Sequence, residues 1–288
     1  MEEKQKALLA DNFAVLRQRE QSLQVQREIT AAQLARLMIR QYGDSPSECF
    51  AAFCQALPDA TGREKLRLCR GLSMPSEEQV PLRGPLRIAC VQNPTNATLF
   101  SNLQAMGIAV ESYTVTSFSH ACERVTDRTC DACLLPLATS ADGRLFRFYD
   151  MLERYDLSVR LAADAETEEE SKRVRYVLAG RTPIPIPSDD GLDFEMEFAL
   201  SDTSLDWEEL WEAVLESSAR LVSVDSLSAS YGNGLSRYYM TLRIRPENTD
   251  AMRLYLSLQY SGYDLIGLYR VLPATGHLKR SYFPQGRR

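Results

Sequence analysis

The chain has 288 residues, of which 44% are hydrophobic and 25% are charged. Its length suits two or three domains, and its composition is close to the globular average, so a single small disulfide-stapled module, a fibrous repeat and a wholly disordered chain are excluded. Lysine and arginine total 33 against 39 aspartates and glutamates, a net charge of −6. No global positive field therefore draws the protein to nucleic acid or to an anionic membrane.

The first residues lack the basic region and short apolar core of a signal peptide, and no run approaches the ~18 apolar residues of a membrane span. We therefore expect a cytoplasmic location. The seven cysteines are an odd number scattered through apolar stretches, which favours reduced core thiols. Cys130 and Cys133, with Cys122 upstream, could alternatively form a metal or redox cluster. Because Cys133 leads into an apolar run typical of a strand, we expect no metal and no cofactor.

Residues 1–74 are predicted to be helical, because no glycine precedes Gly43 and no proline precedes Pro46. Leu9, Leu16 and Leu23 recur every seven residues, but the repeat stops at Thr30, short of a full coiled coil. The repeat therefore predicts a helical packing or dimer face, and this segment would offer a surface to a protein partner.

A helix-turn-helix is a weaker interpretation of the same segment. Residues 29–36 and 48–57 have the right character, but several residues too many separate them. Lysine and arginine exceed aspartate and glutamate by 11 to 9 over residues 1–74, which is little for a DNA-binding surface.

Residues 75–85 concentrate proline and charge and are predicted to be a linker. The following domain, 86–187, alternates short apolar runs with helical patterns, which favours βαβ units and a mainly parallel sheet. Its predicted strands are 87–91, 108–115, 131–136 and 175–179, and its predicted helices are 98–106, 117–126 and 143–154. The acidic run at 164–170 is expected to be a loop or helix start, and the proline-rich residues 183–188 a second linker.

The last region, 190–288, has the order βαββαβ, which is that of a ferredoxin-like domain. Glycines 232 and 234 fall where a hairpin needs a turn, and the basic tail after residue 278 is expected to be solvated. The predicted elements are strands at 194–200, 221–229, 238–244 and 265–272 and helices at 206–218 and 249–260.

Motifs in the last two regions resemble those of a known family. Residues 116–118, Val125 and 131–136 match its Ser-Phe, helix, Asp-Tyr-x-Val-Val-Pro passage, and residues 140–159 match the segment that follows it. Together about 190 residues resemble prephenate dehydratase followed by its regulatory ACT domain. The resemblance implies α/β plus α+β architecture: a helical N-terminal segment, a single prephenate dehydratase-like lobe and a C-terminal ferredoxin-like ACT domain.

The resemblance also implies that the catalytic positions have changed. The family's catalytic Thr-Arg-Phe is Val174-Arg175-Tyr176 here, and valine has no proton to donate. Ala138 and Thr139 stand where the family has glutamate and asparagine. Position 174 comes only 16 residues after position 158, where the family has a complete second lobe. Two interpretations of the remaining polar residues stay open: Ser140, Thr139 and Arg175 bind an anion, or they simply satisfy the strand ends.

In the ACT-like region, Glu208-Glu209-Leu210 replaces the family's Gly-Ala-Leu, and Ser228 and Ser230 lie in the counterpart of its Glu-Ser-Arg-Pro segment. These five residues are candidates for contacting a small aromatic or amino-acid ligand, although the change from glycine to glutamate argues against phenylalanine. Trp207 and Trp211 are expected to be core or dimer surface. The resemblance implies a homodimer formed through this domain.

Three functions remain open. The first is a non-catalytic, regulatory, ligand-sensing or interaction protein of the prephenate dehydratase type, and it is the one we expect. The second is a divergent prephenate dehydratase that makes phenylpyruvate for phenylalanine biosynthesis, with a degenerate chorismate-mutase-like segment in front. The third is a ligand-responsive regulator whose N-terminus binds DNA.

Overall fold

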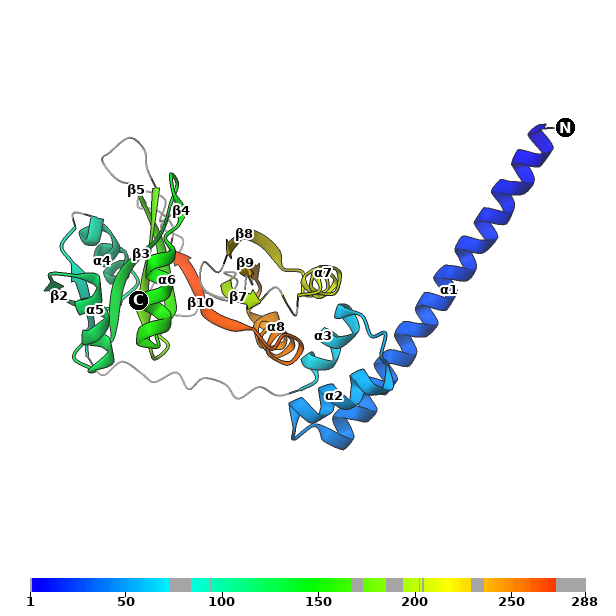
Figure 1. Ribbon diagram of the computed structural model, residues 1–288, viewed down its shortest axis with the longest axis horizontal. Coiled ribbons are helices and arrows are strands. Elements are labelled where there is room, and N and C mark those ends of the chain that lie inside the picture. The colour runs from blue at the N-terminus through cyan, green and yellow to red at the C-terminus, as the bar shows by residue number, and fades with distance from the viewer. Residues whose placement is uncertain are drawn as a thin grey trace, which may run out of the picture. The chain divides into compact units, whose positions relative to one another are not determined.

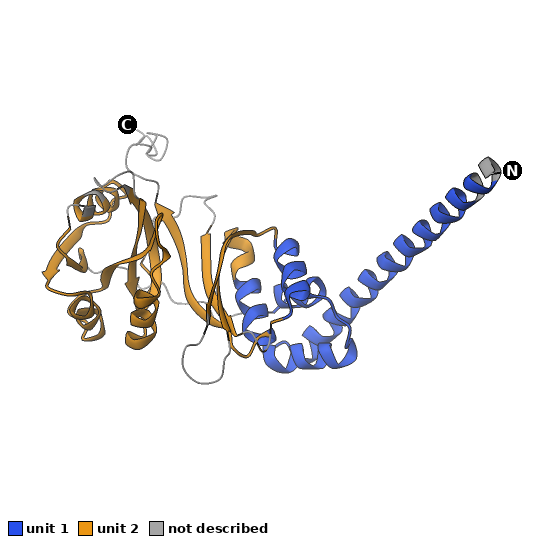
Figure 2. Cartoon of the chain, turned by 45° about the horizontal axis from the view of Figure 1, so that its top comes forward, with its two compact units in different colours: residues 1–74, 206–217, 250–259 blue, residues 75–205, 218–249, 260–288 orange. Residues whose placement is uncertain are grey.

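The computed structural model describes residues 2–72, 84–93, 95–166, 173–184, 194–201, 203, 205–228 and 236–272. The chain divides into two compact units (Figure 2): the first comprises 1–74, 206–217 and 250–259, and the second 75–205, 218–249 and 260–288. Most of the first predicted linker, the end of the second, the hairpin turn at 232–234 and the basic tail lie outside the described residues. Among the helices that the structure describes, none combines the length and the hydropathy that a membrane span requires.

The first unit is helical. Its helices are α1 (Glu2–Tyr42), α2 (Pro46–Ala56), α3 (Gly62–Arg70), α7 (Trp207–Glu216) and most of α8 (Pro246–Gln259). The predicted helicity of the N-terminal segment is thus confirmed, and α1 is unbroken through 29–36, so these residues are not a separate helix of a helix-turn-helix. Helix α3 begins with a capping box, in which Thr61 and Glu64 exchange side-chain and backbone hydrogen bonds.

The second unit is built on one ten-stranded sheet (Figure 1). Its path runs β2-β1-β3-β6-β5-β10-β7-β9-β8, and β4 pairs with β3 off this path. The strands are β1 (Leu86–Val91), β2 (Val110–Val115), β3 (Ala132–Thr139), β4 (Gly143–Arg144), β5 (Ser158–Glu166), β6 (Arg173–Gly180), β7 (Phe194–Ser201), β8 (Arg220–Ser228), β9 (Ser236–Ile244) and β10 (Asp264–Leu272). The helices of this unit are α4 (Thr95–Ala105), α5 (Phe118–Thr126) and α6 (Phe146–Tyr155).

The sheet is mixed, so the prediction of a mainly parallel sheet was wrong. β1 pairs in parallel with β2 and β3, and β5 with β10, while all other pairs are antiparallel. The reason lies at 167–172: a parallel crossover needs a dozen or more residues, and only six separate β5 from β6. β5 also contains Asp164, so the start of the acidic run is strand and not a loop or helix.

The C-terminal strands have the ferredoxin-like order β10-β7-β9-β8, as the βαββαβ pattern predicts. The sequence did not predict that β10 also pairs with β5, which joins these strands to the preceding ones in one sheet. The two strands approach closely at Gly267, where an added Cβ would overlap the side chain and carbonyl oxygen of Val159.

The described core of this unit includes two hydrophobic clusters. One packs α5 and α6, through residues such as Ala121 and Phe148, with strand residues that include Tyr239 and Tyr269 of the C-terminal strands. The other packs Leu99 and Leu103 of α4 with a different set of strand residues. Successive residues of β3 alternate between the clusters, as the pleat of a strand requires.

Candidate functional site

The residues predicted from the family's catalytic motifs lie together, where β3 pairs with β6. Ala138 is opposite Arg175, and Thr139 is opposite Val174, while Tyr176 pairs with Pro136. The Thr139 hydroxyl donates to Asp142 at 2.9 Å and accepts from the Asp142 backbone N–H at 2.8 Å. The Ser140 hydroxyl accepts the Arg173 N–H at 3.1 Å. Both hydroxyls therefore hold local backbone at the strand ends.

Arg175 forms ion pairs with two carboxylates of the same unit. Its Nε and Nη2 donate to Asp164 on β5 at 2.8 and 3.0 Å, and its Nη1 donates to Glu195 on β7 at 2.7 Å. Burial alone would lower the pKa of Arg175, but the hydrogen bond to Asp164 and the negative charges of Glu195 and Asp164 outweigh it, so the pKa is raised. An incoming anion would have to displace one of these carboxylates.

Glu195 is almost fully buried, and its carboxylate accepts a hydrogen bond from a second arginine, Arg243, at 2.8 Å. Two strand positions farther along β7, Glu197 is buried as well. Its two carboxylate oxygens accept the hydroxyls of Tyr149 at 2.6 Å and Tyr269 at 2.8 Å. These two glutamates were not singled out from the sequence, where the available signal was a pair of acidic residues at alternate positions of an apolar strand.

Arg144 completes this second buried group. It pairs with Glu197, donates to Asp225 at 2.6 Å, and also donates to the hydroxyls of Ser223 and Thr241 at 2.7 Å each. Burial raises the pKa of Tyr149 to about 12. Every group here has a partner within the chain, which is the arrangement of a structural network rather than of a site awaiting a ligand.

The ACT-ligand candidates on α7 are also engaged. Asp206 caps the helix by accepting the backbone N–H groups of Glu208 and Glu209 at 3.0 and 3.1 Å. The Glu208 side chain is exposed and Leu210 is buried. Ser228 ends β8, with its backbone opposite Ser236, while the Ser228 side chain and all of Ser230 lie outside the described residues.

Glu209 points to the other helices of its unit. Its carboxylate pairs with Lys65 of α3 at 2.9 Å and accepts the Tyr255 hydroxyl at 3.1 Å and the Gln259 amide at 3.2 Å. The aromatic side chains of Trp207 and Trp211 are nearly half exposed, so they are surface and not core. The three α7 residues predicted to contact a ligand therefore have different surroundings: Glu209 bonds neighbouring helices, Leu210 lies in the core and Glu208 is exposed to solvent.

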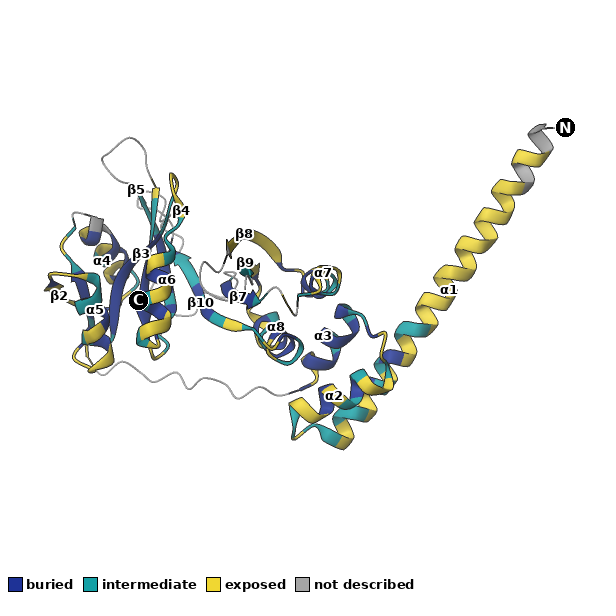
Figure 3. Ribbon diagram, in the orientation of Figure 1, coloured by how far each residue is buried: buried dark blue, intermediate teal, exposed yellow. Residues whose placement is uncertain are grey.

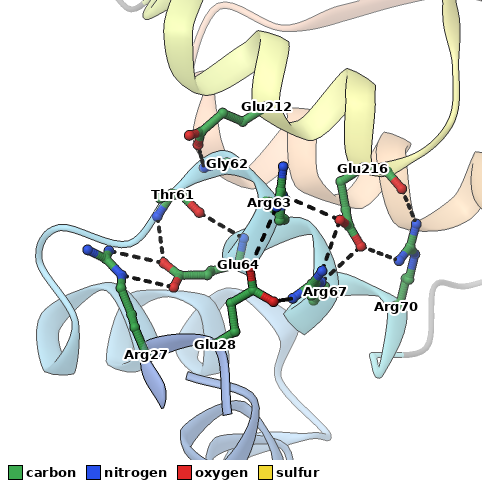
Figure 4. A network of polar contacts seen from close by, with 10 residues as sticks. All are labelled: Arg27, Glu28, Thr61, Gly62, Arg63, Glu64, Arg67, Arg70, Glu212 and Glu216. Atoms are coloured by element: carbon green, nitrogen blue, oxygen red, sulfur yellow. Dashed lines mark hydrogen bonds and ion pairs between the residues drawn. The ribbon is translucent and has the colours of Figure 1, made fainter. Parts of the chain in front are cut away.

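Figure 4 shows the contact between α3 and α7. Glu216, the last residue of α7, accepts hydrogen bonds from the guanidinium groups of Arg67 and Arg70, each at 2.9 Å. The Glu212 carboxylate accepts a hydrogen bond from the backbone N–H of Gly62 at 3.0 Å. Gly62 lies so close to α7 that an added Cβ would overlap the Glu209 carbonyl oxygen. Specific polar contacts therefore join α3 of the N-terminal segment to α7 of the ACT-like region.

All seven cysteines are free, and Cys130 lies in the core. The sulfur atoms of Cys122 and Cys133 are 3.9 Å apart. Burial is the main cause that raises the pKa of Cys130, which disfavours a reactive thiolate. Within the described ranges, no three histidine, cysteine, aspartate or glutamate residues are grouped so as to hold a metal ion.

Comparison with solved structures shows a shared fold. The protein is similar to the prephenate dehydratase from Streptococcus mutans, with a TM-score of 0.52 and 12% sequence identity over 65% of this chain and 98% of that one. Lower TM-scores relate it to GqqA, described as a novel type of quorum-quenching acylase (0.49, 15% identity, 65% and 96% covered), and to the Arthrobacter aurescens prephenate dehydratase in complex with L-Phe (0.47, 12%, 64% and 90%).

No family model and no curated protein matches the sequence. The similarity at 12% identity confirms the predicted resemblance at the level of fold. A shared fold does not by itself carry an activity from one protein to another.

Proposed function

We propose that this protein is a non-catalytic member of the prephenate dehydratase type that acts as a regulatory or interaction module. The observation that carries the proposal is the direct antiparallel pairing of β5 with β6, which continues without a register shift from Leu161 to the last pair, Glu166 and Arg173. The family's second lobe would have to be inserted at this point. Without a second lobe, no cleft closes on prephenate to exclude water.

The side chains at the catalytic positions support the same proposal. The dehydratase reaction expels carbon dioxide and a hydroxide from prephenate, which requires an acid near the leaving oxygen and donors for the carboxylates. Val174 offers no proton, and Arg175 is already paired with Asp164 and Glu195. The polar groups that remain, on Thr139 and Ser140, are used at the strand ends.

Prephenate turnover by the purified full chain tests the proposal. We expect no turnover above background, because Val174 stands where the family has its acid and, on this proposal, no second lobe closes a cleft. Val174→Thr is the matched variant, since it restores the missing hydroxyl, and we expect it to remain inactive. A wild-type turnover number in the ordinary enzymatic range of ~1 to 10³ s⁻¹ would establish the alternative, a divergent dehydratase. Rescue by Val174→Thr would show that a single lobe suffices.

The ligand of the ACT-like region is the second part of the proposal. We expect phenylalanine to bind weakly or not at all, because Asp206 already occupies the N–H groups of Glu208 and Glu209 that an amino-acid carboxylate would need. The exposed Glu208 adds negative charge at the same helix end. The chain would then respond to another amino acid or to a partner.

Calorimetry with millimolar phenylalanine measures this directly. A dissociation constant below about 100 μM, equivalent to roughly −5.5 kcal/mol, would contradict the expectation. Glu208→Gly then locates the pocket. If binding is unchanged by that substitution, the pocket lies away from this helix end.

A further inference from the structure

The N-terminal part of α1 presents apolar side chains that nothing in the described chain covers. Every residue from 9 to 26 is exposed (Figure 3). The first residue of α1 with an inter-helical hydrogen bond or ion pair among those described is Arg27, which bonds Glu64 of α3, and the first buried residue is Ala31. About five turns of helix therefore carry no face that packs against another described part of the chain.

The large apolar residues of this part include a regular stripe. Leu9, Phe13, Leu16 and Leu23 are 64%, 73%, 61% and 66% exposed. Their spacing places them at the a and d positions of a heptad, and Glu20 fills the remaining a position. We call these five residues the α1 stripe. Such a stripe buries its apolar area when it pairs with another helix.

We propose that the α1 stripe is an interface at which two copies of the chain pair through antiparallel α1 helices. The charges on the stripe decide the direction. A parallel pair would set Glu20 against Glu20, and Lys6, the preceding a position, against Lys6. Like charges facing each other in a partly desolvated seam are unfavourable.

The antiparallel pair removes both conflicts. With Phe13 opposite Leu16 of the second copy, Leu9 is opposite Glu20 and Leu23 is opposite Lys6. Glu20 then lies one helical turn from the second copy's Lys6, and the same ion pair repeats across the two-fold axis. The interface is isologous and closes on itself, so it makes a dimer and not a filament. If the mass measurement below shows a monomer, the α1 stripe is left for a different protein to bind.

Zero-length carbodiimide cross-linking of the unmodified full chain tests the direction of pairing. Within one helix, Lys6 and Glu20 are 14 residues or roughly 21 Å apart, too far to be joined directly. A peptide linking Lys6 to Glu20 therefore comes from two copies, and we expect it. If no such peptide forms under conditions that cross-link other lysine–carboxylate pairs, the antiparallel arrangement is wrong.

The solution mass of the full chain at tens of micromolar tests the stripe. We expect Leu16→Glu to weaken association at least tenfold, seen as a shift of the midpoint of dissociation to higher protein concentration. Val15→Glu and Val25→Glu are matched controls, because both are exposed apolar residues of α1 outside the stripe; they should keep the wild-type mass. A monomeric wild type, an unaffected Leu16→Glu variant, or equal loss in the controls would each overturn the proposal.

Charge exchange gives an independent readout. Lys6→Glu and Glu20→Lys should each weaken the dimer several-fold, and the double variant should restore it, because the ion pair is re-formed with reversed polarity. Circular dichroism establishes that each variant keeps its helices. A double variant weaker than both single variants would contradict the antiparallel register.

Discussion

Tyr149 illustrates how burial fixes the protonation of a single side chain. Its hydroxyl donates to the buried carboxylate of Glu197, and burial raises its pKa to about 12, against about 10 in an unfolded chain. Between these two pH values the folded state binds more protons than the unfolded state, so stability falls as pH rises, by about 1.4 kcal/mol per pH unit for this one group.

We therefore expect the free energy of unfolding to decline between pH 10 and 12, and to decline less steeply in Tyr149→Phe. At neutral pH that variant should already be less stable by roughly 1–3 kcal/mol, because Glu197 loses a hydrogen bond in a buried site. Denaturant titrations at a series of pH values measure both effects. An alkaline slope equal to that of the wild type would show that Tyr149 is not protected from ionisation.

Between secondary-structure elements, the close contact of α3 with α7 depends on one glycine, Gly62. Gly62→Ala places a methyl group on the Glu209 carbonyl oxygen, which is backbone and cannot rotate away. We expect a loss of roughly 1–3 kcal/mol in the free energy of unfolding, as for other overpacked sites. Thermal and denaturant unfolding of the full chain provide the measurement.

Gly71→Ala is the matched control for this prediction. Gly71 follows the same helix, and its added methyl would meet mainly the δ-methyl of Ile39, the mobile end of a side chain. We expect a smaller effect than at Gly62. Equal losses in the two variants would mean that the close approach of α3 to α7 does not explain the Gly62 result.

At the same scale, local sequence signals predicted many of the elements, but they did not predict a strand over 158–166 or all of the strand pairings. Alternation of short apolar runs with helical patterns placed α5 and α6 correctly, and Ser117 caps α5 as its residue type favours. The pairing of β5 with β10 could not be predicted, because both strands are largely apolar and nothing in either sequence specifies which strand it pairs with. The direction of β6 could have been inferred from the short connection before it.

The candidate site was predicted unevenly for a related reason. Positions 136–139 and 174–176 were recognised from motifs and do lie side by side. The partners of Arg175 were missed, because Glu195 is 20 residues away and reaches it only once β7 has joined the sheet. Long-range ion pairs are set by tertiary packing, which periodicity does not reveal.

At the scale of the whole molecule, the continuous sheet couples the C-terminal strands to the dehydratase-like strands. Gly267 of β10 pairs with Val159 of β5, and after a shift of register the last three residues of β10 pair in parallel with Leu161, Ala162 and Ala163. The hydrophobic cluster that contains Val159 also contains Ile266 and Tyr269 of β10. A substitution that displaces β10 should therefore also weaken the backbone hydrogen bonds of β5.

Gly267→Ala tests this coupling, because its methyl would overlap the carbonyl oxygen and side chain of Val159. We expect the amides of β5 to exchange hydrogen faster in this variant, since the pairing with β10 must open to make room. Gly262→Ala is the control within the same C-terminal region, because its methyl would meet Ser201 of β7 instead. That variant should leave β5 protected. Equal exchange of β5 in the wild type and in Gly267→Ala would show that the two groups of strands open independently although they share one sheet.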